Sequence, residues 1–153
     1  MNRHKLFLII LMVILVDQLS KYFISNNMHL YETINVIPNF FNLYYIQNDG
    51  GAFSILEGHM FLFYLVSIIG LVILYFIYKQ ANTNILKIAV AFVVGGLFGN
   101  LIDRVFYQKV IDFISLNFGS YHFAIFNVAD IFITVGIILL LIDTLFINKK
   151  KEN

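Results

Sequence analysis

The stretch MFLFYLVSIIGLVILYFIY, residues 60–78, indicates the fold class, because its nineteen residues include no charged side chain. At a rise of about 1.5 Å per residue, a helix of this length nearly spans a hydrocarbon core of about 30 Å. The whole chain of 153 residues is 60% apolar and has a mean hydropathy of +0.84. We therefore predict an integral membrane protein in which this segment is one transmembrane helix.

Three further segments are apolar enough for a membrane span, although each contains or adjoins acidic residues. These segments are residues 6–24, 88–107 and 126–147, and their acidic residues are Asp17, Asp103, Asp130 and Asp143. We predict an all-α membrane protein of four transmembrane helices that forms a single domain over residues 1–153. The first apolar run is not followed by a recognisable cleavage site with small residues, so we interpret it as an uncleaved span.

The connections between the predicted spans differ in character. The one from Lys79 to Lys87 is short and polar, which is typical of a helix-to-helix turn. Residues 25–59 and 108–125 contain segments rich in aromatic and branched side chains, such as VIDFI, which favour short strands. A break at Gly119 and Ser120 follows VIDFI. We expect these two loops to form a small β-rich region outside the cytoplasm.

Basic residues in the loops orient the bundle, since cytoplasmic loops carry an excess of Lys and Arg. Three basic residues fall on one side of the predicted spans, namely Lys21, Arg104 and Lys109. Seven fall on the other side, namely Arg3, Lys5, Lys79, Lys87, Lys149, Lys150 and Lys151. We therefore expect both termini to be cytoplasmic.

Composition excludes several classes of protein. A formal net charge of +1 with 12% charged residues argues against nucleic-acid binding. The chain has no cysteine, which rules out disulfides, thiolate metal sites and a cysteine nucleophile.

Ionisable side chains within membrane spans cost about 2.5 to 3.5 kcal/mol on insertion scales and are candidates for function by default. Four fall toward the outer ends of the predicted spans, namely Asp17, Asp103, Arg104 and Asp130, and Asp112 follows a few residues beyond the third span. Asp143 lies instead near the cytoplasmic lysines, where snorkelling or pairing accounts for it. The outer group is therefore the candidate site.

Helical spacing places these polar residues on common faces. Asn100, Asp103 and Arg104 stand at i, i+3 and i+4, and Asn127 and Asp130 stand at i and i+3. Just before the first set, glycines at 95, 96 and 99 allow a neighbouring backbone to approach closely. We interpret the glycines as packing residues and the polar faces as the site.

Asp112 and Asp130 are the best candidates for a catalytic pair. Asp130 is predicted to lie near the positive end of a helix dipole and beside Asn127, both of which favour its anion. Asp112 lies in the apolar segment VIDFI, where desolvation favours the protonated form. Two such carboxyl groups can share a proton and activate a water molecule for amide hydrolysis. Asp103, which adjoins Arg104, fits half of a structural ion pair better.

Other interpretations of these acids remain open at this point. They could form a polar network that only holds helices together, as in a scaffold subunit, or belong to a proton- or ion-conducting protein. The gap between the outer acids and Asp143 argues against a conduction path. A metal site is also conceivable, but the four histidines are scattered and no paired-histidine helix motif is present.

Five strings resemble the lipoprotein signal peptidases, also called signal peptidase II, and occur in that family's order. They are DQLSK at 17–21, NDGGAF at 48–53, GGLFGNLIDR at 95–104, VIDF at 110–113 and FNVAD at 126–130. The family pattern usually has Ala where this chain has Gly51 and often Gly where it has Ser54. These departures concern only the shape of the loop after Asn48.

The resemblance implies an aspartyl endopeptidase of the bacterial plasma membrane that cleaves prolipoproteins just before a cysteine carrying diacylglycerol. It implies catalytic roles for Asp112 and Asp130 and pocket-lining roles for five polar residues, namely Asp17, Asn48, Asn100, Arg104 and Asn127. The expected partners are lipidated prolipoproteins and membrane lipid, with no obligate protein partner, no metal and no organic cofactor. The expected active site lies near the outer leaflet.

Overall fold

The computed structural model of the chain describes residues 1–50 and 59–147. Its helices are α1 (Arg3–Asn27), α2 (Met60–Lys79), α3 (Asn84–Tyr107) and α4 (Val128–Ile142), and a π-helical turn, η2 (Asp143–Ile147), continues α4. All four helices are long and apolar enough to cross a membrane, counting α4 with the start of η2. The predicted set of four membrane helices is thereby confirmed.

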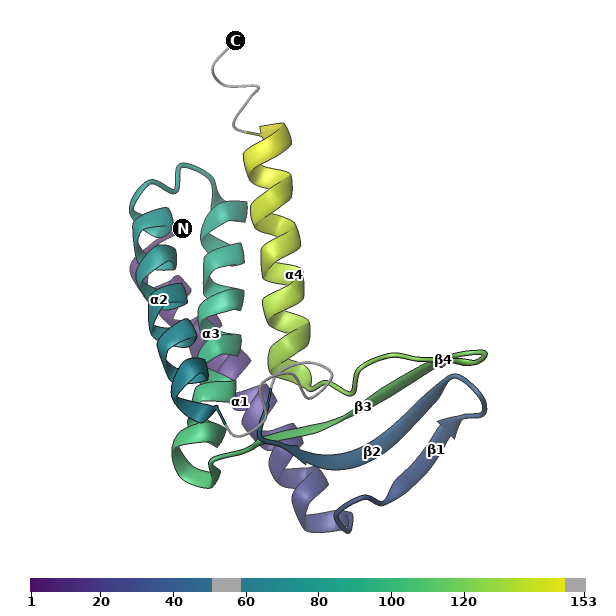
Figure 1. The fold of residues 1–153 in the computed structure, drawn as a ribbon. Helices are drawn as coiled ribbons and strands as arrows, with labels where there is room; N and C mark the ends of the chain where they lie inside the picture. The colour runs from purple at the N-terminus through teal and green to yellow at the C-terminus, as the bar shows by residue number, and fades with distance from the viewer. Residues whose placement is uncertain (51–58, 148–153) are drawn as a thin grey trace.

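Four strands form the small antiparallel sheet that the aromatic and branched segments predicted. They are β1 (Thr33–Ile37), β2 (Phe41–Asn48), β3 (Val110–Phe118) and β4 (Tyr121–His122), in the order β1-β2-β3-β4. Gly119 adopts a φ of +64° in the turn between β3 and β4, which explains the predicted break at this point. Figure 1 shows the sheet projecting from one end of the bundle, while the N-terminus and the far end of α4 lie toward the other.

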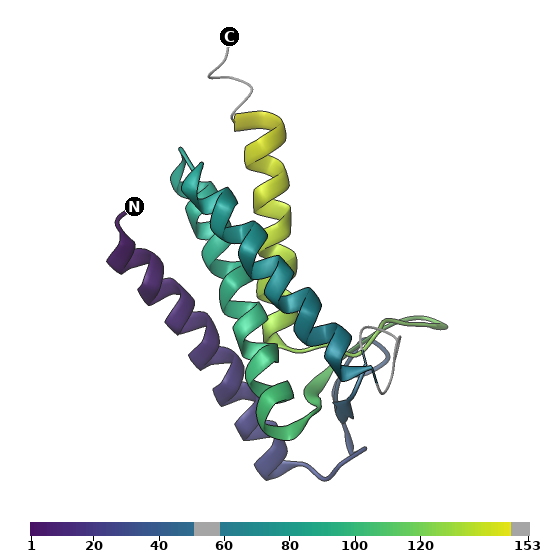
Figure 2. The same cartoon turned by 60° about the vertical axis from the view of Figure 1, so that its left-hand side comes forward.

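Helix α3 is central, and it packs against the other three helices. Figure 2 shows α1 and α4 on either side of it. A Cβ added at Gly95 would lie 2.7 Å from Val13 of α1, and one added at Gly96 would lie 2.6 Å from the carbonyl oxygen of Ala129 in α4. Because real Cβ contacts are longer than this, the glycines permit the close approach that the sequence indicated.

The ends of α3 follow from local chemistry. The Thr83 side chain accepts a hydrogen bond from the amide of Leu86 and caps the start of the helix. Gln108, with a φ of +56°, ends it and turns the chain directly into β3. Only residues 80–83 join α2 to α3, in agreement with the predicted short turn.

Asp143 differs from its expected setting. It is fully buried rather than extended toward the surface, and its carboxylate accepts a hydrogen bond from the Thr83 hydroxyl. It therefore joins the α2–α3 connection to the end of α4, and snorkelling does not describe it. Three of the basic residues used for orientation, at 149–151, lie outside the described residues, as do Gly51 and Ser54.

Candidate active site

Helix α3 contributes the residues that the spacing placed on one face. Asn100 and Asp103 are 7% and 1% exposed, and Arg104 is half-buried. The guanidinium carbon of Arg104 lies 4.8 Å from the centre of the Phe63 ring, and Tyr64 donates a hydrogen bond to the Arg104 carbonyl. Both aromatic residues belong to α2, so α2 fixes the position of Arg104 from the side opposite the bundle centre.

The start of α4 positions Asp130 through a capping box. Asn127 is the N-cap, and its side-chain oxygen accepts from the amide of Asp130 at 3.1 Å. The Asp130 carboxylate accepts in return from the amide of Asn127 at 3.2 Å. The motif predicted the shared face of these residues, and the reciprocal bonds additionally hold Asp130 at the positive end of the helix dipole.

The sheet positions Asp112. In the β2–β3 register Asp112 lies opposite Ile46, and Asn48 lies opposite Val110. The Asn48 side chain donates to Asp112 at 2.8 Å and accepts from the amide of Gly50 at 2.9 Å. Strand pairing therefore brings the side-chain amide of Asn48, at the end of β2, to the carboxyl group of Asp112 on β3.

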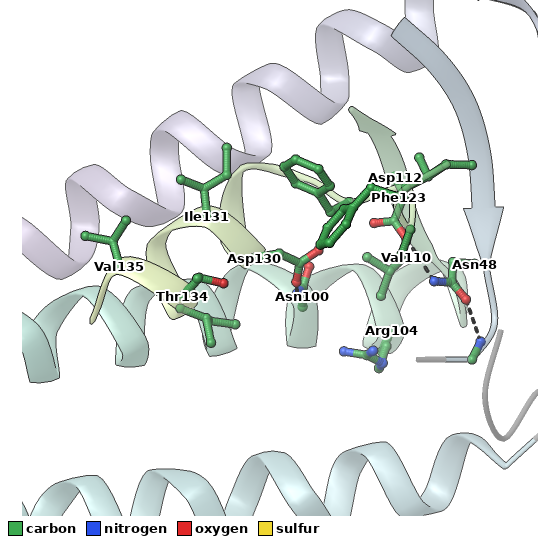
Figure 3. A pocket seen from close by; sticks show the side chains of 15 residues that line it. Asn48, Asn100, Arg104, Val110, Asp112, Phe123, Asp130, Ile131, Thr134 and Val135 are labelled. Atoms are coloured by element: carbon green, nitrogen blue, oxygen red, sulfur yellow. Dashed lines mark hydrogen bonds between the residues drawn. The ribbon is translucent and has the colours of Figure 1, made fainter. Parts of the chain in front are cut away.

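Two asparagine amides connect the carboxyl groups of Asp112 and Asp130. Asn127 donates to Asp112 at 2.7 Å and to the side-chain oxygen of Asn100 at 3.0 Å. Asn100 donates in turn to Asp130 at 2.8 Å. Figure 3 shows the Asn100 and Asp130 side chains facing each other, with Asp112 bonded to Asn48 nearby. The two acids thus belong to one hydrogen-bonded network.

Burial separates the two acids electrostatically. Asp112 is 3% exposed, and burial together with the nearby charge of Asp130 raises its pKa from 3.8 to about 7. Hydrogen bonds from Asn48 and Asn127 act in the opposite direction and lower this pKa by less. Near neutral pH Asp112 can therefore hold a proton and donate it.

Both acids face a cavity of about 460 Å³. Its polar wall consists of Asn48, Asn100, Arg104, Asp112 and Asp130. The remaining wall is mostly apolar and follows α4 through Ile131, Thr134 and Val135 (Figure 3). The cavity therefore combines one polar end with an apolar groove.

Two sequence-predicted site residues lie behind this cavity rather than on its wall. Asn127 is fully buried and links the two acids from the rear. Asp17 is also fully buried, accepts from the amide of Ala129 at 2.8 Å, and contacts α3 where Gly99 leaves room. Asn127 therefore acts on Asp112 directly, and Asp17 acts on the site through the first turn of α4.

Lys21 is the residue that sequence reasoning misplaced. We expected it among the outer loop charges, but it lies within α1 and is 2% exposed. Its ammonium pairs with Asp17 at 2.8 Å and with Asp103 at 2.9 Å. The expected ion pair of Asp103 therefore exists, but its partner is Lys21 and not the adjacent Arg104. The spacing of Asp17 and Lys21 at i, i+4 was the available signal.

This arrangement fits acid–base chemistry on a carbonyl group. One carboxyl group is buried and has a raised pKa, the second is held by helix-terminal donors, and both face the same cavity. Within residues 1–50 and 59–147, no group of three His, Asp or Glu side chains is arranged to hold a metal ion.

Comparisons with known proteins agree on one family. The family model described as Signal peptidase (SPase) II matches residues 9–146. A lipoprotein signal peptidase of Listeria welshimeri is 45% identical over 147 residues, which cover 95% of each chain. One of Bacillus pumilus is 41% identical over 148 residues, covering 95% of this chain and 96% of the relative.

A solved structure described as a bacterial membrane enzyme, determined by the in meso method, has the same fold. It superposes with a TM-score of 0.86 at 36% identity and covers 94% of this chain and 88% of its own. A second structure with the same description gives a TM-score of 0.85 and covers 94% of both chains.

Proposed function

The chain belongs to the signal peptidase II family, whose members process prolipoproteins, and from that premise we propose that it is an aspartyl endopeptidase. Its proposed substrate is a diacylglyceryl-modified prolipoprotein, which it cleaves immediately before the lipidated cysteine. The proposed catalytic residues are Asp112 and Asp130. One observation carries the proposal, namely that both carboxyl groups face one cavity and are joined by the amides of Asn100 and Asn127.

The different settings of the two acids support a division of roles. Asp130, held by the helix terminus, is the base that takes a proton from the attacking water. The water oxygen bonds to the scissile carbonyl carbon, while the proton on Asp112 stabilises the carbonyl oxygen. The tetrahedral intermediate then collapses, the C–N bond breaks, and a carboxyl proton passes to the leaving amine. The dyad ends the cycle with one proton, as it began.

The remaining polar wall supports substrate binding. Asn48 and Arg104 line the cavity beside the dyad, where Arg104 presents donors to carbonyl groups of an extended peptide and Asn48 donates to Asp112. We assign Asn100 and Asn127 mainly to orienting the acids, because their amides are already bonded to them. Asp17 acts from behind by holding the first turn of α4 through Ala129.

The apolar part of the cavity supports a lipid-linked substrate. It continues from the dyad along α4, a helix with the length and hydropathy of a membrane span. A signal peptide and its acyl chains lie in the bilayer, so a site for them must open laterally toward lipid. We propose that the sheet and the dyad lie at the outer face of the plasma membrane and that both termini are cytoplasmic. The location of the sheet at the end opposite the N-terminus is consistent with this topology (Figure 1).

The test is cleavage of a diacylglyceryl-modified prolipoprotein by purified protein in detergent, with a chelator present. We expect Asp112→Asn and Asp130→Asn each to abolish cleavage while remaining folded. Asp143→Asn is the matched control, because it removes a fully buried carboxylate at the other end of the bundle and should leave cleavage intact.

Each rival predicts a different result. Unimpaired cleavage by either dyad variant would refute the assignment of catalytic roles. Loss of wild-type activity on adding the chelator would favour a metal enzyme. Loss of folded protein in both dyad variants, with no cleavage by the wild type, would favour a scaffold.

A further inference from the structure

Lys21 is a buried cation without an assigned role in the proposed reaction. An ammonium group has three N–H donors and accepts nothing. Three oxygen atoms receive them, namely those of Asp17 at 2.8 Å, Asp103 at 2.9 Å and the Asn100 side chain at 2.9 Å. With an exposure of 2%, Lys21 is enclosed by these acceptors.

The third acceptor connects Lys21 to the candidate dyad. The Asn100 oxygen accepts from Lys21 and from Asn127, and the Asn100 nitrogen donates to Asp130 at 2.8 Å. A rotated amide would direct its NH₂ group at the ammonium and at the Asn127 donor, and would direct its oxygen at a carboxylate. All three contacts would then be repulsive. The charge of Lys21 therefore selects one orientation of the Asn100 amide.

Net charge does not explain an effect of Lys21 on Asp130. Two carboxylates surround one ammonium, so this trio, formed by Lys21, Asp17 and Asp103, has a formal charge of −1. A group with that charge does not favour a further anion nearby. What reaches Asp130 is the oriented amide dipole, which presents its donor end to the carboxylate.

We propose that Lys21 is a positioning residue, which rests on the proposed function: by fixing the Asn100 amide it maintains a hydrogen-bond donor on the Asp130 carboxylate. It touches neither substrate nor reacting atoms. The other charged groups near Asp130 are Arg104 on α3 and Asp112 on β3, and neither contacts Lys21 in the described network. The charge of Lys21 also lowers the pKa of Asp112, as the smallest of the causes acting on it, so the net charge of the trio is kept constant in the test below.

The test must separate orientation from folding, because Lys21→Met alone leaves two buried carboxylates without their cation. The double variant Lys21→Met/Asp103→Asn leaves only one, Asp17, which still accepts hydrogen bonds from Gln18 and Ala129, and the charge of the trio stays at −1. Asp143→Asn is again the matched control for loss of a buried polar contact. For each protein the folded, monodisperse fraction in detergent is isolated first. Then kcat and KM are measured on a diacylglyceryl-modified prolipoprotein.

We expect the double variant to lose about ten- to a hundredfold in kcat, the equivalent of one hydrogen bond to a charged group, with KM changed less than about twofold. The control should retain the wild-type kcat and KM. A purely structural role would reduce the yield of folded protein but would leave kcat of the folded fraction unchanged.

Wild-type kcat in the folded double variant would overturn the proposal. Failure of this variant to fold, when the control folds, would also overturn it and leave Lys21 with a structural role. Failure of the proposed function is recognised separately, because Asp130→Asn would then cleave as well as the wild type does.

Discussion

Replacing Asp112 with Asn should remove a pH dependence from the stability of the protein. Burial and the charge of Asp130 raise the pKa of Asp112 from 3.8 to about 7. A carboxyl group with a raised pKa in the folded state stabilises that state fully only below its unfolded pKa. This stability is lost as the pH rises toward the folded pKa. As the pH rises from 3.8 to about 7, the wild type should therefore lose stability that the Asp112→Asn variant does not lose.

The size of the effect follows from the two pKa values. Between 3.8 and about 7 the free energy of unfolding falls by about 1.4 kcal/mol for each pH unit. From about pH 5 to about pH 8 the loss amounts to about 2.6 kcal/mol, because the decline levels off once folded Asp112 is ionised. Unfolding of both proteins in the same detergent at the two pH values gives this quantity. The change in the free energy of unfolding between the two pH values is compared for the two proteins. Any effect of the substitution that does not depend on pH cancels in this comparison.

Asp130→Asn supplies the second arm of this experiment. It removes the charge that is the second cause of the raised pKa of Asp112 and leaves the first cause, burial. The pH dependence should therefore shrink but persist. Equal responses to pH in the wild type and in Asp112→Asn would refute the reasoning, because Asp112 would then titrate at its ordinary pKa and could not serve as the acid.

Two further predictions concern activity and packing. Cleavage should decline as the pH rises through about 7, because Asp112 loses the proton that the carbonyl oxygen requires, and a kcat profile that stays flat on the alkaline side would contradict this role. Gly99→Ala should destabilise the protein by about 1 to 3 kcal/mol, because the added carbon would lie 2.5 Å from the Asp17 carboxylate. Gly70→Ala is its control, since its nearest contact is 3.4 Å away, and equal melting temperatures for the two variants in detergent would show that the helices can separate to accommodate the methyl group.

The fold was readable from sequence because its determinants are local. A run of apolar residues indicates each helix, and branched and aromatic residues next to a turn indicate each strand. Ends of elements were harder to place. Helix α1 begins at Arg3 and continues to Asn27, beyond the expected span on both sides. Its polar residues are compatible with helix because they face α3 and α4, and hydropathy along one segment does not report those neighbours.

The site was only partly readable for a related reason. Spacing within α3 and within α4 grouped Asn100 with Asp103 and Asn127 with Asp130, since one helix fixes each set. The bonds from Asn127 to Asn100 and from Asn100 to Asp130 depend on how α3 and α4 are aligned. The glycines of α3 indicate a close approach such as that at Gly96, but they do not say which helix approaches or in which register. Lys21 was misplaced because it was counted with the loop charges near a predicted helix end, although its i, i+4 spacing from Asp17 indicated a pair within the helix.

The choice of amides around the dyad has a chemical consequence. Asn48 and Asn127 each donate to Asp112, and these bonds lower its pKa by less than burial raises it. A cation at either position would favour the Asp112 anion much more strongly and would remove the acid from the proposed reaction. Neutral donors can hold a buried carboxyl group in place while leaving its proton available. In agreement, the buried cation Lys21 is bonded to the Asn100 amide and to neither carboxylate of the dyad, and its charge is the smallest of the causes acting on the pKa of Asp112.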